Sequence, residues 1–235
     1  MENVKISFRQ LSEIAWQQIL SATAFKTHYA QAEFFRKIDA LDELRKKADY
    51  NTGSISSSSA WLLYSAAFYF RPSRILEIGT FIGKSTLSLA MGADDRGEMC
   101  EIHTCDVSND IDLPATTRSK IVQYKKTPST AMLKQISESG DPRQFDFVHL
   151  DGRVQREDIQ HIRSLVHENA VIALDDFEGI EKGVANLMLF RENQIFPGHA
   201  VIYPCEKKSL RENNLGDIST TALLVPARTI QILPQ

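Results

Sequence analysis

Three aspartates follow two apolar runs of the sequence and could share one chemical task. Asp151 comes directly after the run 145–150, and Asp175 and Asp176 come directly after the run 170–174. Packed together without a counter-charge, three carboxylates would repel and raise one another's pKa. A hard divalent cation such as Mg²⁺ or Mn²⁺ removes that repulsion, and so does a substrate ammonium. We therefore predict a metal site here, with helix capping by one or two of the aspartates as the alternative.

A turn with two glycines follows another apolar run, at 74–78. Gly79 and Gly83 lie four residues apart, which lets the backbone approach a ligand closely, and the helix N-terminus beyond them favours a negative group. The spacing is neither GxGxxG nor that of the GxxxxGK[ST] phosphate loop. Glu77, two residues before the first glycine, suits an ammonium better than a pyrophosphate. The turn predicts a ligand site, with a plain tight turn as the alternative.

Two further positions after apolar runs carry polar side chains. Asp106 follows the run 101–105 and could accept both hydroxyls of a ribose; alternatively it could cap a helix or be a solvated loop acid. Ser129 and Thr130 open a helix after the run 120–124, where they could cap that helix, line an adenine pocket or do both.

The apolar runs alternate with segments of helical period, and this alternation predicts how the polar residues are positioned. Short buried runs separated by helices are typical of parallel strands in a sheet covered on both faces. Such sheets bind ligands at the carboxyl ends of their strands, near the point where strand order reverses. The predicted strands are 74–78, 101–105, 120–124, 145–150 and 170–174.

Two more strand candidates, near 199–204 and 219–225, follow a helix at about 180–193. No helical period separates them, so we predict an antiparallel hairpin whose strands are joined by a polar loop. The fold class is therefore α/β, with a seven-stranded, mostly parallel sheet, helices on both faces and this C-terminal hairpin.

Residues 1–50 are predicted to form a helical extension that acts as a lid or a dimer contact. The segment is rich in Glu, Gln, Lys and Arg and has no strand pattern, and residues 52–54 break it before an apolar helix at 56–70. Residues 51–235 then form the main domain. The extension carries aromatic side chains for which core packing is the default expectation: Trp16, Phe25, Tyr29, Phe34 and Phe35.

Composition excludes several classes of protein. A chain of 235 residues with a net charge of −3 does not hold nucleic acid by bulk charge. The longest apolar stretch, 60–70, is too short to span a bilayer, and the N-terminus lacks the apolar segment of a signal peptide. The three cysteines, Cys100, Cys105 and Cys205, form no CxxC pair, so the sequence predicts a reducing, cytoplasmic location.

The stretch Leu-Glu-Ile-Gly-Thr-Phe-Ile-Gly-Lys-Ser-Thr at 76–86 resembles the first motif of class I S-adenosylmethionine-dependent methyltransferases. Within that superfamily, the chain is similar to the catechol and caffeoyl-CoA type of metal-dependent O-methyltransferase, over most of residues 52–178. The resemblance implies a Rossmann-like fold and S-adenosylmethionine as the cofactor.

The resemblance also implies a role for each matching residue. Glu77 and Gly79 would face the methionine end of the cofactor, and Ser85 would bind its carboxylate. Asp106 would hold the ribose and Ser129 would touch the adenine. Ile55 and Phe81 would pack on the cofactor, and the cofactor site would further include Thr80, Gly83 and Asp151. The metal positions of the family correspond to Asp151, Asp175 and Asp176.

The chain departs from the family at two positions. The last metal position is usually Asn but is Asp176 here, and the general-base lysine is replaced by Val154. The neighbouring Arg153 stays protonated and makes a poor base. A broader group of the superfamily has Asp-Gly-Asp-His at this strand, and its histidine is also missing at Val154.

We therefore predict a methyltransferase that acts on a hydroxyl of a small molecule with divalent-metal help. One alternative is a metal-independent N- or O-methyltransferase that uses Asp151 or His149 as its base, although His149 lies in a buried run, where a core histidine is the default expectation. Further alternatives are a nicotinamide-dependent dehydrogenase and a non-catalytic protein that binds S-adenosylmethionine. A homodimer is compatible with the sequence.

Overall fold

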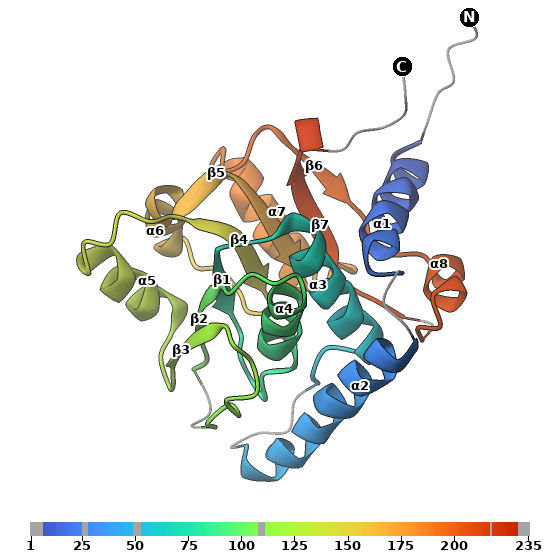
Figure 1. The fold of residues 1–235 in the computed structure, drawn as a ribbon. Helices are drawn as coiled ribbons and strands as arrows, with labels where there is room; N and C mark the ends of the chain where they lie inside the picture. Colours follow the sequence, from blue (N-terminus) through green and yellow to red (C-terminus); the bar gives the residue numbers. More distant parts are fainter. Residues whose placement is uncertain (1–6, 25–27, 49–52, 108–110, 217, 230–235) are drawn as a thin grey trace, which may run out of the picture.

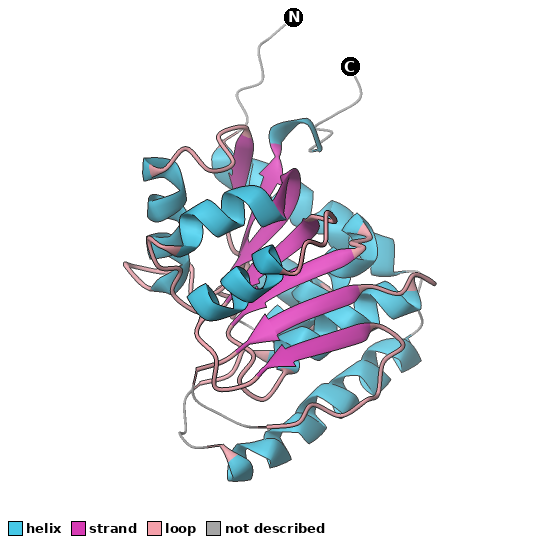
Figure 2. Cartoon of the chain, turned by 90° about the vertical axis from the view of Figure 1, so that its left-hand side faces the viewer, coloured by secondary structure: helices cyan, strands magenta, loops and turns pink. Residues whose placement is uncertain are grey.

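Seven strands form one sheet in the order β3-β2-β1-β4-β5-β7-β6 (Figures 1 and 2). The computed structural model describes residues 7–24, 28–48, 53–107, 111–216 and 218–229. Strands β1 to β5 are parallel, whereas β7 runs antiparallel to both β5 and β6. The predicted fold class, including the antiparallel C-terminal pair, is confirmed. The strands are β1 Arg74–Ile78, β2 Glu101–Cys105, β3 Lys120–Tyr124, β4 Phe145–Leu150, β5 Val166–Leu174, β6 His199–Ile202 and β7 Ala222–Pro226.

Helices cover both faces of the sheet (Figure 2), because successive side chains of each strand point to opposite sides. Ile75 and Phe147 belong to one hydrophobic cluster, whereas the adjacent Leu76 and Val148 belong to the other. The first cluster includes residues of α3 Ser57–Phe70 and α4 Lys84–Asp95. The second includes residues of α5 Ser129–Glu138, α6 Asp158–Leu165 and α7 Lys182–Glu192.

The N-terminal extension consists of α1 Phe8–Ala24, α2 His28–Asp39 and a 3₁₀ helix, η1 Ala40–Lys47. Trp16 is fully buried, and its indole N–H donates to the carbonyl oxygen of Tyr203 at 2.8 Å. Phe34 is also buried, and its ring lies 5.0 Å from that of Trp61 in α3. Both side chains therefore belong to the core on the α3 side of the sheet. The side chains of Phe25 and Tyr29 lie outside the described residues.

The predicted loop between the last two strands is wrong, because it contains a short helix, α8 Lys207–Glu212. Its six residues are too few to show a helical period, but Leu210 is fully buried. Strand β7 begins at Ala222, three residues later than predicted, and β5 begins at Val166, four residues earlier. A second 3₁₀ turn, η2 Ala227–Thr229, follows β7.

Backbone hydrogen bonds align the carboxyl ends of the central strands. Gly79 N donates to Cys105 O at 3.0 Å, Asp151 N to Ile78 O at 2.9 Å, and Asp175 N to Leu150 O at 3.0 Å. The residues that follow β1, β4 and β5 are thereby held side by side at one edge of the sheet. Among the described helices, none is long and apolar enough to cross a membrane.

Candidate functional site

A cavity of about 410 Å³ lies at the carboxyl ends of the strands. Its volume falls in the range of small-molecule and cofactor sites. Predicted site residues line it from the turns after β1, β2, β4 and β5 and from the segment before α3. They are Ile55, Gly79, Phe81, Asp106, Asp151, Asp175 and Asp176; Lys182, Ile218 and Thr220 also contribute.

Gly79 occupies a position that only glycine fits without strain. Its φ of +104° lies in the region that side chains rarely adopt, and a Cβ would lie 3.0 Å from the backbone carbon of Asp151. The absence of a side chain therefore lets β1 and β4 end side by side against the cavity. Gly83 has a φ of +82°, but its missing Cβ makes room for Leu113 instead.

Asp106 shapes the glycine turn from the end of the neighbouring strand. Its Oδ2 accepts a hydrogen bond from the backbone N–H of Phe81 at 2.8 Å, and both residues line the cavity. The side chain is almost buried, at 9 % exposure, so it is not the solvated loop acid that the sequence left open. This carboxylate can accept hydroxyls of a ligand while it holds the turn in place.

Glu77 does not line the cavity but lies beneath it, fully buried. Its Oε1 is 2.9 Å from Nδ1 of His149, and its Oε2 accepts from Thr104 at 2.7 Å and from Thr86. Burial alone would raise the pKa of Glu77, but the hydrogen bonds from His149 and its neighbours lower it overall. Both carboxylate oxygens are thus engaged inside the protein, and no direct contact with a ligand in the cavity follows from this geometry.

His149 is also fully buried and does not line the cavity. Burial disfavours its charged form, but the hydrogen bond and the charge of Glu77 raise the pKa of His149 overall, and its Nδ1 lies 2.9 Å from Glu77 Oε1. A histidine held beneath the strand ends has no access to an acceptor in the cavity. The geometry therefore favours the core interpretation of His149 over the catalytic one.

Three other predicted cofactor residues are buried behind the cavity wall: Thr80, Ser85 and Ser129. Ser85 lies in the first turn of α4, where its side chain contributes a hydrogen bond to Glu77. Ser129 does not cap its helix; its hydroxyl donates to Asp158 at 2.7 Å. The fully buried Asp158 also accepts from Thr130 at 2.7 Å, so the two hydroxyls tie α5 to α6.

The three aspartates meet at one strand edge, but a lysine lies among them. Lys182 Nζ is 2.6 Å from Asp151 Oδ1 and 2.9 Å from Asp176 Oδ2. Asp175 is buried, and its Oδ1 accepts from the hydroxyls of Thr221 at 2.8 Å and Thr220 at 3.2 Å.

These contacts do not fit the predicted metal site. In the part of the chain that the structure describes, no three His, Cys, Asp or Glu side chains are grouped so that they could hold an ion. The physical reason is that an ammonium already bridges Asp151 and Asp176, while Asp175 turns towards two threonine hydroxyls. The positive charge that was expected beside the aspartates is therefore supplied by Lys182.

Asp151 has an unusual electrostatic environment. Burial and the charge of Asp175 raise its pKa to about 6, and the contact with Lys182 limits that rise. The Lys182 pKa is raised, because its two carboxylate contacts outweigh its partial burial. At neutral pH the pair therefore consists of a carboxylate that is more basic than usual and an ammonium that holds its proton firmly.

Helix α7 contributes residues around the cavity that sequence reasoning missed. Besides Lys182 in its first turn, Asn186 donates to Gly152 O and accepts from Val154 N, both at 2.9 Å, and so fixes the turn after β4. Gly183 lies against the turn after β5, where a Cβ would be 2.3 Å from Asp175 O. The available signal was the position of this helix directly after the Asp175-Asp176 pair.

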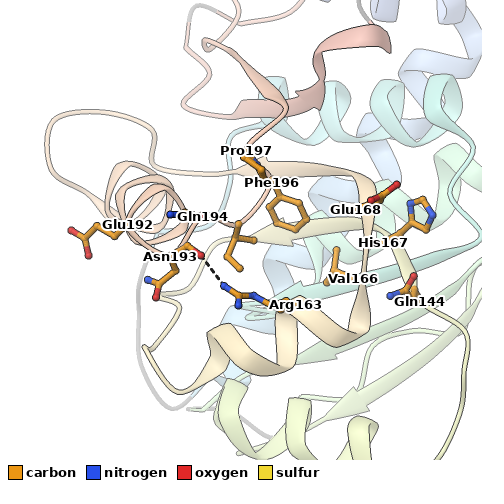
Figure 3. Close-up of a pocket in the computed structure, with 11 residues that line it drawn as sticks. Gln144, Arg163, Val166, His167, Glu168, Glu192, Asn193, Gln194, Phe196 and Pro197 are labelled. Atoms are coloured by element: carbon orange, nitrogen blue, oxygen red, sulfur yellow. Dashed lines mark hydrogen bonds between the residues drawn. The ribbon is translucent and has the colours of Figure 1, made fainter.

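A second hollow of about 730 Å³ lies at the opposite end of the sheet (Figure 3). Its lining includes Phe196, Gln144 and Val166. Gln144 and Val166 lie at the amino ends of β4 and β5. Arg163 donates to the carbonyl oxygen of Asn193 at 2.8 Å across its wall. None of the predicted site residues lines this hollow.

Comparisons with known proteins confirm the predicted resemblance. Residues 76–177 match a family model described as a methyltransferase domain. Caffeoyl-CoA O-methyltransferase 1 of Eucalyptus globulus is 23 % identical over 146 residues, which cover 59 % of each chain. Caffeoyl-CoA O-methyltransferase 1 of Nicotiana tabacum is 23 % identical over 147 residues, covering 59 % of this chain and 62 % of the relative. The chain thus spans about three fifths of the length of these curated relatives.

Solved structures agree with the fold. An O-methyltransferase of Bacillus cereus in complex with S-adenosylhomocysteine superposes with a TM-score of 0.53 at 16 % identity, covering 90 % of this chain and 97 % of that one. The O-methyltransferase TomG of Streptomyces achromogenes, in complex with S-adenosylmethionine, gives 0.52 at 18 % identity, with coverages of 81 % and 89 %. At these identities the likeness concerns the fold alone, a Rossmann-like α/β sheet.

Proposed function

We propose that this chain is an S-adenosylmethionine-dependent methyltransferase that acts on a hydroxyl of a small molecule. The observation that carries the proposal is the cavity at the strand ends, where Gly79, Phe81 and Asp106 form one hydrogen-bonded turn. The match of residues 76–177 to a methyltransferase domain supports a methyl group as the group that is transferred. The caffeoyl-CoA O-methyltransferases among the relatives support an oxygen acceptor on a small molecule.

The residues present fit the cofactor. Gly79 leaves room beside the backbone of Asp151, the Asp106 carboxylate can accept ribose hydroxyls, and Ile55 and Phe81 offer apolar surface. S-adenosylmethionine, when bound, supplies a methyl group on a sulfonium and becomes neutral S-adenosylhomocysteine when that bond breaks. Negative charge around the cavity suits a cationic ligand. The contribution of the protein is then mainly alignment of the acceptor oxygen with the methyl group.

Asp151 is the proposed proton acceptor. It lines the cavity, and its pKa of about 6 makes it a stronger base than an ordinary aspartate while it stays ionised at pH 7. The proton of the acceptor hydroxyl would pass to its carboxylate as the oxygen–methyl bond forms. The prediction of metal assistance finds no fitting ligand set among the described residues, and no step of this proposal uses a metal.

Other parts of the proposal extend to the surroundings of the site. A cytoplasmic location is supported by three buried cysteines that form no disulfide.

A covering role for the N-terminal extension is supported by η1, since Asp42 accepts from the buried Lys84 at 2.9 Å and Arg45 lies 5.5 Å from the ring centre of Phe81. A dimer contact of the extension stays a prediction, as does the lack of a nucleic-acid partner.

Titration calorimetry with S-adenosylhomocysteine tests the function. Wild type should bind it at one site, and Asp106→Ala should weaken binding by about 1–3 kcal/mol, the contribution of hydrogen bonds to a charged group. Asp112→Ala, which removes an exposed carboxylate near the same edge of the sheet, serves as the control and should bind as wild type does. Tighter binding of NADH than of S-adenosylhomocysteine would contradict the proposal and favour a dehydrogenase.

A further inference from the structure

We propose that the Lys182 ammonium is the permanent cation of this site, in the place where a divalent metal would otherwise bridge Asp151 and Asp176. The inference deepens the proposed function and rests on it, because it states how a hydroxyl is activated without a metal. It starts from two distances, 2.6 Å from Nζ to Asp151 Oδ1 and 2.9 Å to Asp176 Oδ2.

The position of Lys182 is fixed by the way its helix begins. The residue opens α7, and the next residue, Gly183, packs against the backbone of Asp175, while Gly183 N donates to Asp176 O at 3.3 Å. One turn further, Asn186 binds the turn that follows Asp151 through two hydrogen bonds. The lysine is therefore held between the ends of β4 and β5 by the same contacts that hold the two aspartates.

The charges of the cluster favour an internal cation over a free ion. Asp151 and Asp176 both contact Lys182, whereas Oδ1 of Asp175 accepts from the hydroxyls of Thr220 and Thr221. A divalent ion at this place would have to displace an ammonium that already satisfies two carboxylates, and it would then lie beside that positive charge. Like charges at such distances repel, so the lysine should exclude the ion.

The same ammonium can reach an acceptor. Lys182 lines the cavity, and its side chain retains 30 % exposure. A hydroxyl placed between Asp151 and Lys182 would have a base on one side and a positive charge on the other. The ammonium would then stabilise the negative charge that develops on the oxygen as its proton passes to Asp151, which is the role a metal plays in metal-assisted transfer.

Binding of Mn²⁺, followed by electron paramagnetic resonance with S-adenosylhomocysteine present, tests the inference without an acceptor. Lys182→Met and Lys182→Gln remove the charge but keep much of the stem, so both should gain a Mn²⁺ site at least about tenfold tighter than any in wild type. Lys182→Arg keeps a charge and should stay free of Mn²⁺. Lys134→Met removes an exposed lysine of α5 and is the matched control, with no gain expected.

Two results would overturn the inference. One is a wild-type chain that binds one Mn²⁺ with an affinity that Lys182→Met leaves unchanged. The other is the absence of any gain in Lys182→Met and Lys182→Gln when both unfold at the wild-type temperature or bind S-adenosylhomocysteine normally. Failure of S-adenosylhomocysteine to bind any variant would instead contradict the proposed function, while the Mn²⁺ titration would still report on the lysine.

Discussion

Asp151 joins three parts of the proposed site. Its backbone lies against Gly79, its Oδ1 accepts from Lys182, and it lines the cavity. Burial at a strand end beside Asp175 makes it unusually easy to protonate. These properties lead to a prediction about pH.

Methyl transfer should rise with pH through about 6. Below that pH Asp151 carries a proton and cannot accept one, and above it the carboxylate is free to do so. The measurement is kcat/KM between pH 5 and 8. Asp151→Asn should lower kcat at pH 7 by about 100-fold or more and remove this limb of the profile. A wild-type profile that is flat across this range would contradict Asp151 as the base.

Gly79→Ala should weaken S-adenosylhomocysteine binding at least about tenfold, or about 1.4 kcal/mol. The added Cβ would press on the Asp151 backbone at 3.0 Å, in a conformation with φ of +104°. Gly97→Ala is the control, because Gly97 has a similar φ of +92° but no atom within 4 Å of its missing Cβ. Equal binding by both variants would show that the turn at Gly79 has only a structural role.

The sequence correctly predicts which segments of the chain meet at the site. It predicts less well which of their side chains line the cavity. Gly79 and Asp106 line the cavity, but Glu77 and Ser85, from the same motif, lie buried behind it. Within one motif, some residues face the cavity and others support the turn from inside the protein. The residue types alone do not show which residue has which role. Sequence reasoning missed Lys182, because a lysine in the first turn of a helix is usually solvated; its one signal was that its helix follows the Asp175-Asp176 pair.

At the scale of elements, α7 holds the turns after β4 and β5 in register. Asn186 is almost fully buried and makes two hydrogen bonds with the backbone of one of these turns. Asn186→Ala should therefore lower the free energy of unfolding by about 1–3 kcal/mol, since it leaves buried backbone groups unpaired. Urea unfolding measures this. Asn193→Ala, at the far end of α7, should have a smaller effect; equal losses would contradict the special role of Asn186.

The strands were predictable and the short helix α8 was not, for a physical reason. The predicted limits of β1 to β4 agree with the structure. The runs of β1, β2 and β4 are almost entirely buried and end at a polar turn, whereas β3 is a half-buried edge strand. Strand β5 begins earlier than predicted because Val166 already pairs with Phe145, ahead of a register shift. The residues 167–169 that follow are polar and not buried, so the apolar run begins only at 170. Helix α8 forms through burial of Leu210 against distant residues, which no local pattern reveals.

At the scale of the whole molecule, the N-terminal helices are part of the core as well as neighbours of the site. Trp16 of α1 is fully buried and bonded to Tyr203, near the C-terminal strands. Trp16→Ala should lower the free energy of unfolding by about 3–5 kcal/mol, as expected for loss of a large buried side chain. Chemical denaturation measures this loss. The Phe8 side chain is 77 % exposed, so Phe8→Ala is the control and should change the free energy of unfolding little. A stable Trp16→Ala variant would mean that α1 is a detachable lid.

The central claim is that the cavity at the carboxyl ends of the strands binds S-adenosylmethionine. A crystal structure of the chain with S-adenosylhomocysteine tests it most directly. The expected result places the ribose hydroxyls within hydrogen-bond distance of Asp106 and the methionine end beside Gly79, with Lys182 still between Asp151 and Asp176. A molecule bound instead in the hollow at the amino ends of β4 and β5, or none bound in a crystal soaked to saturation, would contradict the account.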